Sequence, residues 1–250
     1  MTTAPPPVPA PPPPPPTPTP TPWRVATVVD VVPETARAKT FRLSVPGRPR
    51  HLAGQHYVVR LTAPDGYTAT RSYSVASAPD DGDLVDLTVE RLADGEVSTF
   101  LHDEVVVGDE LEVRGPIGGW FVWRGDTPAL LVGGGSGVVP LMSMLRLARA
   151  TGRSDLVRLV VSVRSPDDLY YAGEIEGPET TVVHTRVAPP GSPRPVGRLR
   201  PDDLAPLVGG DDTVVYVCGS AGFCTAVGDL CVGLGVAPGR IRVERFGPTG

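Results

Sequence analysis

A run of glycines between two apolar segments constrains this chain more than any other feature. The stretch is LLVGGGSGVVPLMSMLRLARA, residues 130–150. Its first residues are typical of a buried strand, and the residues after Gly137 have the spacing of a helix. Free N–H groups and the positive dipole at such a helix start suit a pyrophosphate. The fingerprint G-x-G-x-x-G fits Gly135 and Gly137, but its third glycine falls on Pro140. A variant fingerprint, a structural turn and another type of nucleotide site all remain open.

The second half of the chain alternates between apolar strands and helices. The stretches ALLVGG, LVRLVVSVRS, TTVVHTRV, TVVYVCG and RIRVERF have the pattern of strands, and GVVPLMSMLRLARATG and SAGFCTAVGDLCVGLG have that of helices. Continuously apolar strands that alternate with helices indicate a parallel sheet covered on both faces. We therefore expect a doubly wound α/β domain over residues 125–250.

The first half has a different pattern. Short stretches rich in Val, Leu, Thr and Tyr are separated by Gly, Pro and Asp turns, which is typical of an antiparallel sandwich or barrel. One segment, GEVSTFLHDEV, has helical spacing instead, with Val97, Phe100, Leu101 and Val105 on one side. We expect residues 23–124 to form an antiparallel β-barrel domain, so the chain has two domains.

Residues 1–22 are mostly proline and small residues, with almost nothing apolar to bury. We expect this segment to be disordered or polyproline II, either as a solvated extension or as a docking segment for SH3-like or WW-like modules. It lacks the basic start and apolar region of a secretory signal. No later stretch reaches the roughly 18 apolar residues of a membrane span. We therefore expect a cytoplasmic protein.

Composition argues against nucleic acid and metal as ligands. A net charge of −5 is unlike the concentrated basic surface of a nucleic-acid binder. The cysteines at 218, 224 and 231 form no C-x-x-C pair and no plant-type iron–sulfur pattern, and the four histidines show no ligand spacing. We expect no bound metal.

The stretch RSYS, at 71–74, carries a possible phosphate ligand in a strand. Strand geometry puts Arg71 and Tyr73 on one face and Ser72 and Ser74 on the other. A guanidinium suits a phosphate, and a phenol ring beside it offers a stacking surface. A strand with an exposed arginine and a core tyrosine is the alternative.

Six motifs occur in one order along the chain. They are GQHYVVRL at 54–61, RSYS at 71–74, GPIG at 115–118, GGGSGVVP at 133–140, CGSAGF at 218–223 and VERF at 243–246. Together they resemble the ferredoxin–NADP⁺ reductase superfamily, especially the reductase components of bacterial oxygenases, over residues 23–247. The proline that ends the glycine motif matches this superfamily. The resemblance implies an antiparallel flavin barrel and a nicotinamide-nucleotide domain, with FAD and the nicotinamide meeting between them.

The resemblance assigns FAD to two segments of the barrel. Arg71 would bind the flavin pyrophosphate, Tyr73 would pack on the isoalloxazine, and Ser74 would lie near flavin N5. In the stretch ERLADGEVS, backbone N–H groups at a helix start would meet the pyrophosphate, and Ser98 would cap the helix. The flavin-contacting residues expected on this basis are Arg71, Ser72, Tyr73, Ser74, Val89, Glu90, Arg91, Gly95, Glu96, Val97 and Ser98.

The second domain would hold the nicotinamide coenzyme. The expected contacts are Gly134, Gly135, Gly137 and Val138 at the turn, with Cys218 and Gly219 beside the nicotinamide ring. A buried strand-end thiol is the alternative for Cys218. Glu244 matches the acidic residue of the superfamily, and Phe246 matches the terminal aromatic that shields the flavin, although four residues follow it. The residues expected to act in catalysis are Ser74, Cys218, Glu244 and Phe246.

The choice between NADPH and NADH depends on the charged residues that follow the second and third strands of this domain. Cations suit the 2′-phosphate of NADPH, whereas a carboxylate suits the ribose diol of NADH. Arg164 and Ser165 follow one strand, and Thr185 and Arg186 follow the next and resemble the Ser-Arg pair of NADP-type members. Arg198 is a further candidate cation. We expect NADPH, with NADH as the alternative because Asp167 and Asp168 are adjacent.

These features predict an FAD-dependent NAD(P)H oxidoreductase. Hydride would pass from NAD(P)H to FAD, and single electrons would then pass to an acceptor. Only residues 247–250 follow the last motif, so we expect a separate acceptor such as a ferredoxin-like protein, an oxygenase or a small molecule. The alternative is a non-catalytic flavin- or nucleotide-binding interaction module whose Pro-rich tail docks to a partner. A dehydrogenase acting directly on an organic substrate has no Tyr-x-x-x-Lys motif or catalytic histidine to support it.

Overall fold

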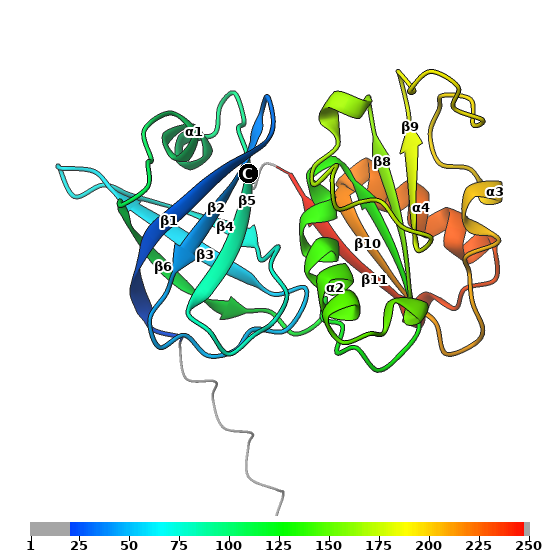
Figure 1. The fold of residues 1–250 in the computed structure, drawn as a ribbon, viewed down its shortest axis with the longest axis horizontal. Coiled ribbons are helices and arrows are strands. Elements are labelled where there is room, and N and C mark those ends of the chain that lie inside the picture. The colour runs from blue at the N-terminus through cyan, green and yellow to red at the C-terminus, as the bar shows by residue number, and fades with distance from the viewer. Residues whose placement is uncertain (1–20, 248–250) are drawn as a thin grey trace, which may run out of the picture.

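The computed structural model describes residues 21–247, which form two sheets side by side (Figure 1). The expectation for the Pro-rich segment 1–22 therefore lies outside the described residues, apart from its last two. Within residues 21–247, no helix is long and apolar enough to cross a membrane.

The first sheet has six antiparallel strands in the order β4-β3-β6-β1-β2-β5. Its strands are β1 (Trp23–Thr35), β2 (Ala38–Ser44), β3 (His56–Thr62), β4 (Thr68–Ser74), β5 (Leu84–Glu90) and β6 (Glu110–Ile117). A bridge between Val75 and Leu87 joins the two edge strands at one corner. This closure gives the antiparallel barrel that the sequence predicts.

The barrel core follows the alternation of the strands. Phe41, Leu43, Tyr57 and Val59 point inward and are almost fully buried, because successive side chains on a strand face opposite sides. The interior is therefore filled by side chains.

Helix α1 (Glu96–Asp103) covers the gap between β4 and β5. Val97 and Leu101 are buried, whereas Phe100, which the helical spacing puts on the same side, is 45% exposed. The buried stripe instead includes Ser98 and His102. His102 Nε2 lies 3.0 Å from the Val89 carbonyl oxygen, and this contact turns that side of the helix inward.

The second sheet has five parallel strands in the order β11-β10-β7-β8-β9. Its strands are β7 (Ala129–Gly134), β8 (Val157–Val163), β9 (Thr180–His184), β10 (Val214–Ser220) and β11 (Ile241–Phe246). The helices are α2 (Val138–Ala150), α3 (Pro201–Leu204) and α4 (Ala221–Gly233), with short 3₁₀ helices at Gly135–Gly137, Ser154–Leu156, Pro166–Asp168 and Pro238–Arg240.

Both faces of this sheet are covered. Helix α2 packs on one face through Leu141, Met142 and Leu145, and α3 and α4 pack on the other through Leu204 and Val227. A parallel sheet covered on both faces confirms the predicted doubly wound fold.

The apolar core under α2 continues into the barrel half. Ala53, Ala76, Phe121 and Trp123 belong to the same buried cluster as the residues of α2. Polar contacts add to this junction, because the Tyr216 hydroxyl donates to the Val122 carbonyl at 2.9 Å. The two halves therefore meet over a packed boundary along α2 and β11 (Figure 1).

Candidate functional site

The carboxyl ends of three neighbouring strands bring the predicted nicotinamide residues together. In the parallel register, Cys218 of β10 pairs with Gly133 of β7 on one side and with Glu244 of β11 on the other. Phe246 ends β11 opposite Ser220. This edge is where ligands bind in open parallel sheets.

The glycines of the turn are required by close packing. A Cβ atom on Gly137 would lie 2.1 Å from the Cys218 carbonyl oxygen, and one on Gly134 would lie 2.8 Å from the Phe223 ring. Gly135 has a φ of +55°, which favours glycine. The turn therefore presses the start of α2 against the end of β10, and its backbone stays open to a ligand.

Helix α2 begins directly after this turn, at Val138. Pro140 lies in its first turn, where a missing N–H costs no intrahelical hydrogen bond. The first turn contains no acidic residue. The Val138 N–H is used inside the turn, on the Gly135 and Ser136 carbonyls. The helix dipole and the N–H groups of the turn itself can thus face an anion without a competing carboxylate.

A contact between the two halves joins two predicted catalytic residues. The Ser74 hydroxyl, at the end of β4, donates to Glu244 Oε1 at 3.4 Å. Burial raises the pKa of Glu244 to about 7, although the hydrogen bond from Ser74 opposes this shift. Glu244 can therefore gain or lose a proton near neutral pH.

Cys218 lies beside this pair and is fully buried. Burial raises the pKa of its thiol well above 9, and the nearby Glu244 raises it further. Cys218 is therefore a neutral thiol at neutral pH and fills space without adding charge.

The first predicted flavin segment, residues 71–74, presents an aromatic ring and a guanidinium to a ligand. The Tyr73 hydroxyl is buried and has no hydrogen-bond partner within residues 21–247, and such a group is costly unless a ligand satisfies it. Arg71 is exposed, and its guanidinium donates to the carbonyl of Thr70 at 2.7 Å. The orphaned phenol and the accessible cation fit a ligand that carries both an aromatic ring system and phosphate.

The second flavin segment differs from expectation at Ser98. Gly95 precedes α1, and no side chain caps the helix. Ser98 Oγ instead donates to the Gly95 carbonyl at 3.1 Å and accepts from the Leu92 N–H at 3.2 Å. The expected Ser98 cap is therefore wrong, because this hydroxyl is used to fold the preceding loop. The N–H groups of Glu96 and Val97 are left for a ligand.

Three predicted residues of this segment are engaged elsewhere. Val89 is buried in the barrel core, Glu90 lies 3.6 Å from the Arg37 guanidinium, and Arg91 binds Asp103 at 2.8 Å. An open hollow of about 520 Å³ lies along α1. It is lined by Ala93, Asp94, Gly95, Glu96, Thr99, Phe100, Asp103 and Glu104.

The predicted 2′-phosphate residues lie together at the ends of β8 and β9. The N–H of Arg186 donates to the Arg164 carbonyl at 2.9 Å, and both arginine side chains are exposed. Ser165 lies among them, but its hydroxyl donates to Asp168 at 2.6 Å. The N–H of Gly197 donates to the His184 carbonyl, which brings Arg198 to the same edge. Three cations, Arg164, Arg186 and Arg198, and the carboxylate of Asp168 thus share this edge.

Two residues beside the site, His56 and Phe223, were not predicted from the sequence. His56 pairs with Ser74 across β3 and β4, and burial lowers its pKa. Phe223 packs against Gly134 and Gly219. Both residues lie inside motifs that the sequence singles out, but their roles depend on pairing and packing between distant segments.

Taken together, these features define a two-domain oxidoreductase with a flavin half and a nicotinamide half. Family models agree. The oxidoreductase FAD-binding domain matches residues 25–122, and the oxidoreductase NAD-binding domain matches residues 131–229. The chain belongs to the ferredoxin–NADP⁺ reductase superfamily.

Two curated relatives illustrate the similarity. The ferredoxin–NAD(P)⁺ reductase component of the naphthalene 1,2-dioxygenase/salicylate 5-hydroxylase systems of Ralstonia sp. is 29% identical over 90% of this chain. The ferredoxin reductase component of 3-ketosteroid-9-alpha-monooxygenase from Mycolicibacterium smegmatis is 30% identical over 88% of this chain. The aligned regions span 68% and 64% of these two relatives.

Solved structures give the same fold. The FAD/NAD-binding domain of nitric oxide dioxygenase from Vibrio cholerae has a TM-score of 0.79 and 26% identity, covering 90% of this chain and 99% of that one. A ferredoxin NADP⁺ reductase from Neisseria gonorrhoeae with bound FAD and NADP has a TM-score of 0.76 and 23% identity, covering 89% and 98%.

Proposed function

We propose that this protein is an FAD-dependent NAD(P)H reductase that delivers electrons to a separate acceptor. The observation that carries the proposal is the contact between Ser74 of the FAD-binding half and Glu244 of the NAD-binding half, at 3.4 Å. The two half-sites meet where a nicotinamide and a flavin have to come together. We assign the halves to residues 23–124 and 125–250.

The residues present fit both groups. Arg71 and the first N–H groups of α1 would hold the flavin pyrophosphate, and Tyr73 would pack on its ring. The backbone of the turn at Gly133–Gly137 would hold the coenzyme. When bound, FAD accepts hydride from NAD(P)H and releases electrons one at a time.

The chain's own residues supply placement and proton control. Ser74 keeps a hydroxyl at the junction, and the Glu244 carboxyl can hold or release a proton near neutral pH. Cys218 remains uncharged, so no fixed thiolate disturbs the site. Phe246 packs partly buried against the α2-side core. In this position it would screen the junction from water.

We assign NADPH as the preferred coenzyme, with NADH accepted less well. Arg164 and Arg186 supply two exposed cations for a 2′-phosphate, and Asp168 limits the preference. Arg186→Ala should raise the KM for NADPH about tenfold, as expected for loss of one charge-assisted contact, and change that for NADH less than twofold. Arg153→Ala, at the opposite end of the sheet, is the charge-matched control. Equal effects of Arg186→Ala on both coenzymes would remove this assignment.

The acceptor we propose is a ferredoxin-like protein or an oxygenase component in the cytoplasm. Support comes from relatives that are themselves named ferredoxin reductase components of oxygenase systems. Ferricyanide and cytochrome c can replace such an acceptor in an assay because both take single electrons.

An anaerobic titration tests the proposal directly. Protein refolded with excess FAD should be yellow, and its flavin absorbance should bleach on addition of NADPH. Ferricyanide should then restore the colour. A protein that binds FAD without bleaching would instead be a non-catalytic binding module, and a colourless protein would exclude the flavin assignment.

A further inference from the structure

Helix α2 makes two polar contacts with the segment that follows Ser74. The Ser143 hydroxyl donates to the Ser77 carbonyl at 2.7 Å, and Arg146 Nη1 donates to the Ala76 carbonyl at 2.9 Å. Residues three apart lie on the same face of a helix. One face of a nucleotide-domain helix therefore holds two consecutive carbonyls of the barrel.

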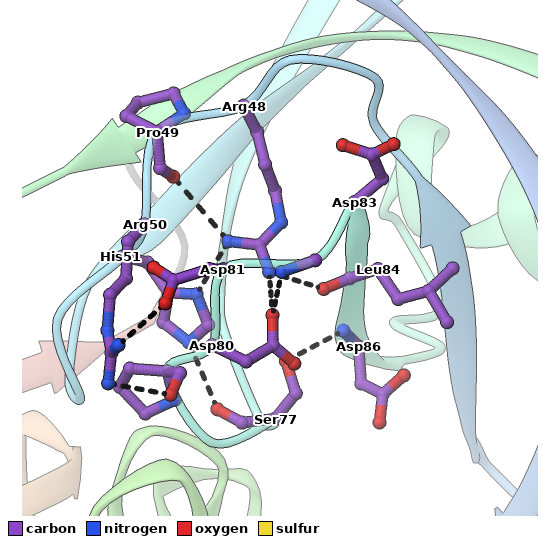
Figure 2. Close-up of polar contacts among 12 residues, drawn as sticks. Arg48, Pro49, Arg50, His51, Ser77, Asp80, Asp81, Asp83, Leu84 and Asp86 are labelled. Atoms are coloured by element: carbon purple, nitrogen blue, oxygen red, sulfur yellow. Dashed lines mark hydrogen bonds and ion pairs between the residues drawn. The ribbon is translucent and has the colours of Figure 1, made fainter.

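The barrel holds the same segment from the other side. The N–H of Val75 donates to the Gln55 carbonyl at 2.9 Å, and the N–H of Ala76 donates to the Asp86 carbonyl at 2.8 Å. Figure 2 shows His51 with its Nε2 directed at the Ser77 carbonyl, at 3.1 Å. Residues 75–77 are thus fixed between the barrel and α2, immediately after Ser74.

The Ser77 anchor is itself rigidly supported within the barrel. His51 Nδ1 lies 3.3 Å from the fully buried Arg48 guanidinium, which also binds Asp80 and the Leu84 carbonyl (Figure 2). Because Arg48 donates to Nδ1, Nε2 is the protonated nitrogen that donates to Ser77.

Arg146 is held in one position by neighbours on both halves. Its guanidinium binds Glu174 at 2.5 and 2.9 Å and lies 4.9 Å from the centre of the Tyr171 ring. Tyr171 contacts the barrel, because its N–H donates to Glu34 at 3.0 Å and its hydroxyl lies 2.5 Å from Thr88 Oγ1. Only 19% of the Arg146 side chain is exposed.

The position of Ser143 and Arg146 along α2 shows which parts of the molecule their contacts connect. The helix begins at Val138, directly after the glycine turn, and reaches Ser143 and Arg146 within its 13 residues. One rigid element thus connects the proposed coenzyme turn with the strand end that carries Ser74. A displacement of about 1 Å between reacting groups can reduce a rate about 100-fold.

We propose that Ser143 and Arg146 are positioning residues, which set the place of Ser74 relative to the coenzyme turn by holding the Ala76 and Ser77 carbonyls. They act through the backbone and touch no reacting atom. This inference rests on the proposed function, because it concerns the alignment of the two half-sites.

Helix α2 also offers a matched control. Arg149 lies three residues after Arg146, and its guanidinium binds Glu179 at 2.6 Å and the Glu174 carbonyl at 2.6 Å. All of these contacts stay within the nucleotide half. Arg149→Gln therefore removes the same charge and a comparable ion pair from the same helix without touching the barrel.

The test compares Arg146→Gln with Arg149→Gln in the FAD-loaded full chain. At saturating NADPH, flavin reduction in a stopped-flow experiment should be about tenfold slower in Arg146→Gln and within twofold of wild type in Arg149→Gln. Arg146→Lys, which keeps a donor for the Ala76 carbonyl, should recover part of the rate. A purely structural role would instead lower the melting temperature of both glutamine variants without separating their rates.

A second measurement needs no flavin chemistry. In FAD-free protein, hydrogen exchange at the amides of Val75 and Ala76 should be faster in Arg146→Gln than in Arg149→Gln, because the first loses a tether on that segment. If Arg146→Gln does not fold, Ser143→Ala replaces it, with faster exchange in residues 75–77 and slower flavin reduction expected.

The outcomes separate the two proposals. If wild-type protein is not bleached by NADPH or NADH, the proposed function fails, and the exchange comparison still decides whether Arg146 holds residues 75–77 in place. If wild-type protein is bleached but the Arg146 and Arg149 variants match each other in rate and exchange, or Ser143→Ala matches wild type in both, the positioning role is overturned.

Discussion

The two helix starts assigned to phosphate groups are built in opposite ways. Helix α2 follows a parallel strand and a glycine turn, and its first turn contains no acidic residue. Helix α1 has eight residues, follows an irregular loop and has Glu96 in its first turn. The turn before α2 is pressed against the end of β10, whereas α1 borders an open hollow.

This difference implies two ways of binding an anion. At α2 the backbone suffices, because packing fixes its N–H groups and no carboxylate competes. At α1 the dipole is short and a carboxylate stands beside it, so a cation from another strand is needed. Arg71 of β4 is that cation in our assignment. Binding at α2 should therefore depend on shape, and binding at α1 should depend on charge.

The largest loss of activity should come from a substitution that adds a side chain to the glycine turn before α2. Gly137→Ala places a Cβ atom 2.1 Å from the Cys218 carbonyl oxygen, so the turn has to move. We expect kcat/KM for NAD(P)H to fall about 100-fold or more, which corresponds to about 2.7 kcal/mol, while FAD content stays unchanged. Gly222→Ala has open space around its Cβ position and serves as control. Loss of FAD together with coenzyme binding would contradict the assignment of this turn to the coenzyme alone.

The next effect tests the need for a cation at α1. Arg71→Ala should weaken FAD binding roughly 10- to 100-fold, because a hydrogen bond to a charged group contributes about 1.5–3 kcal/mol. Quenching of flavin fluorescence on titration measures the dissociation constant. Arg60→Ala removes an equal charge from the adjacent strand β3, where Arg60 binds Glu112 at 2.6 Å. A similar loss of FAD affinity in both variants would mean that the overall positive charge of the barrel, and not a specific contact of Arg71, strengthens FAD binding.

The sequence predicts the fold of the α2 half more fully than it predicts the details of helix α1. Apolar strands alternating with helices predict the parallel sheet, because burial on both faces leaves a continuous pattern. The helical spacing of residues 95–105 does not predict that Phe100 is exposed, since in an eight-residue helix the tertiary contacts of His102 decide which side turns inward. The prediction also fails at Ser98, where a hydroxyl typical of a cap folds the preceding loop.

The parts of the candidate site that are formed by one continuous stretch of sequence could be predicted. The glycine turn is one continuous stretch, so its sequence carries its geometry. The contact of Ser74 with Glu244 joins residues 170 positions apart, and only the packing of the two halves reveals it. Arg146 reads as an ordinary surface arginine of a helix, and its contact with Ala76 follows from that same packing.

Glu244 pairs in register with Cys218 at the end of β10, and its burial predicts a stability effect. Its pKa rises from 4.5 to about 7 on folding, so the folded state binds its proton more tightly than the unfolded state. Stability due to this group is therefore present below about pH 4.5 and is lost as the pH rises to about 7. Glu244→Gln should raise the melting temperature of FAD-free protein at pH 8 and raise it less at pH 5.

The control for this prediction is an exposed carboxylate. Glu176→Gln should leave the melting temperature nearly unchanged at both pH values, because Glu176 lies at the surface. A gain for Glu244→Gln that is equal at pH 5 and pH 8 would show that packing, and not deprotonation, limits the stability of wild type.

The smallest effect concerns the carboxylate of α1 itself. If charge governs this site, Glu96→Gln should tighten FAD binding by about two- to threefold, because an exposed charge contributes only a few tenths of a kcal/mol. The gain should shrink at high salt, which screens surface charges. Glu96 also accepts a hydrogen bond from the Tyr67 hydroxyl at 3.2 Å, so Tyr67→Phe is needed to separate that contact from the charge. Weaker binding in Glu96→Gln would mean that the carboxylate supports the helix start more than it repels the phosphate, and the contrast between α1 and α2 would then be one of shape alone.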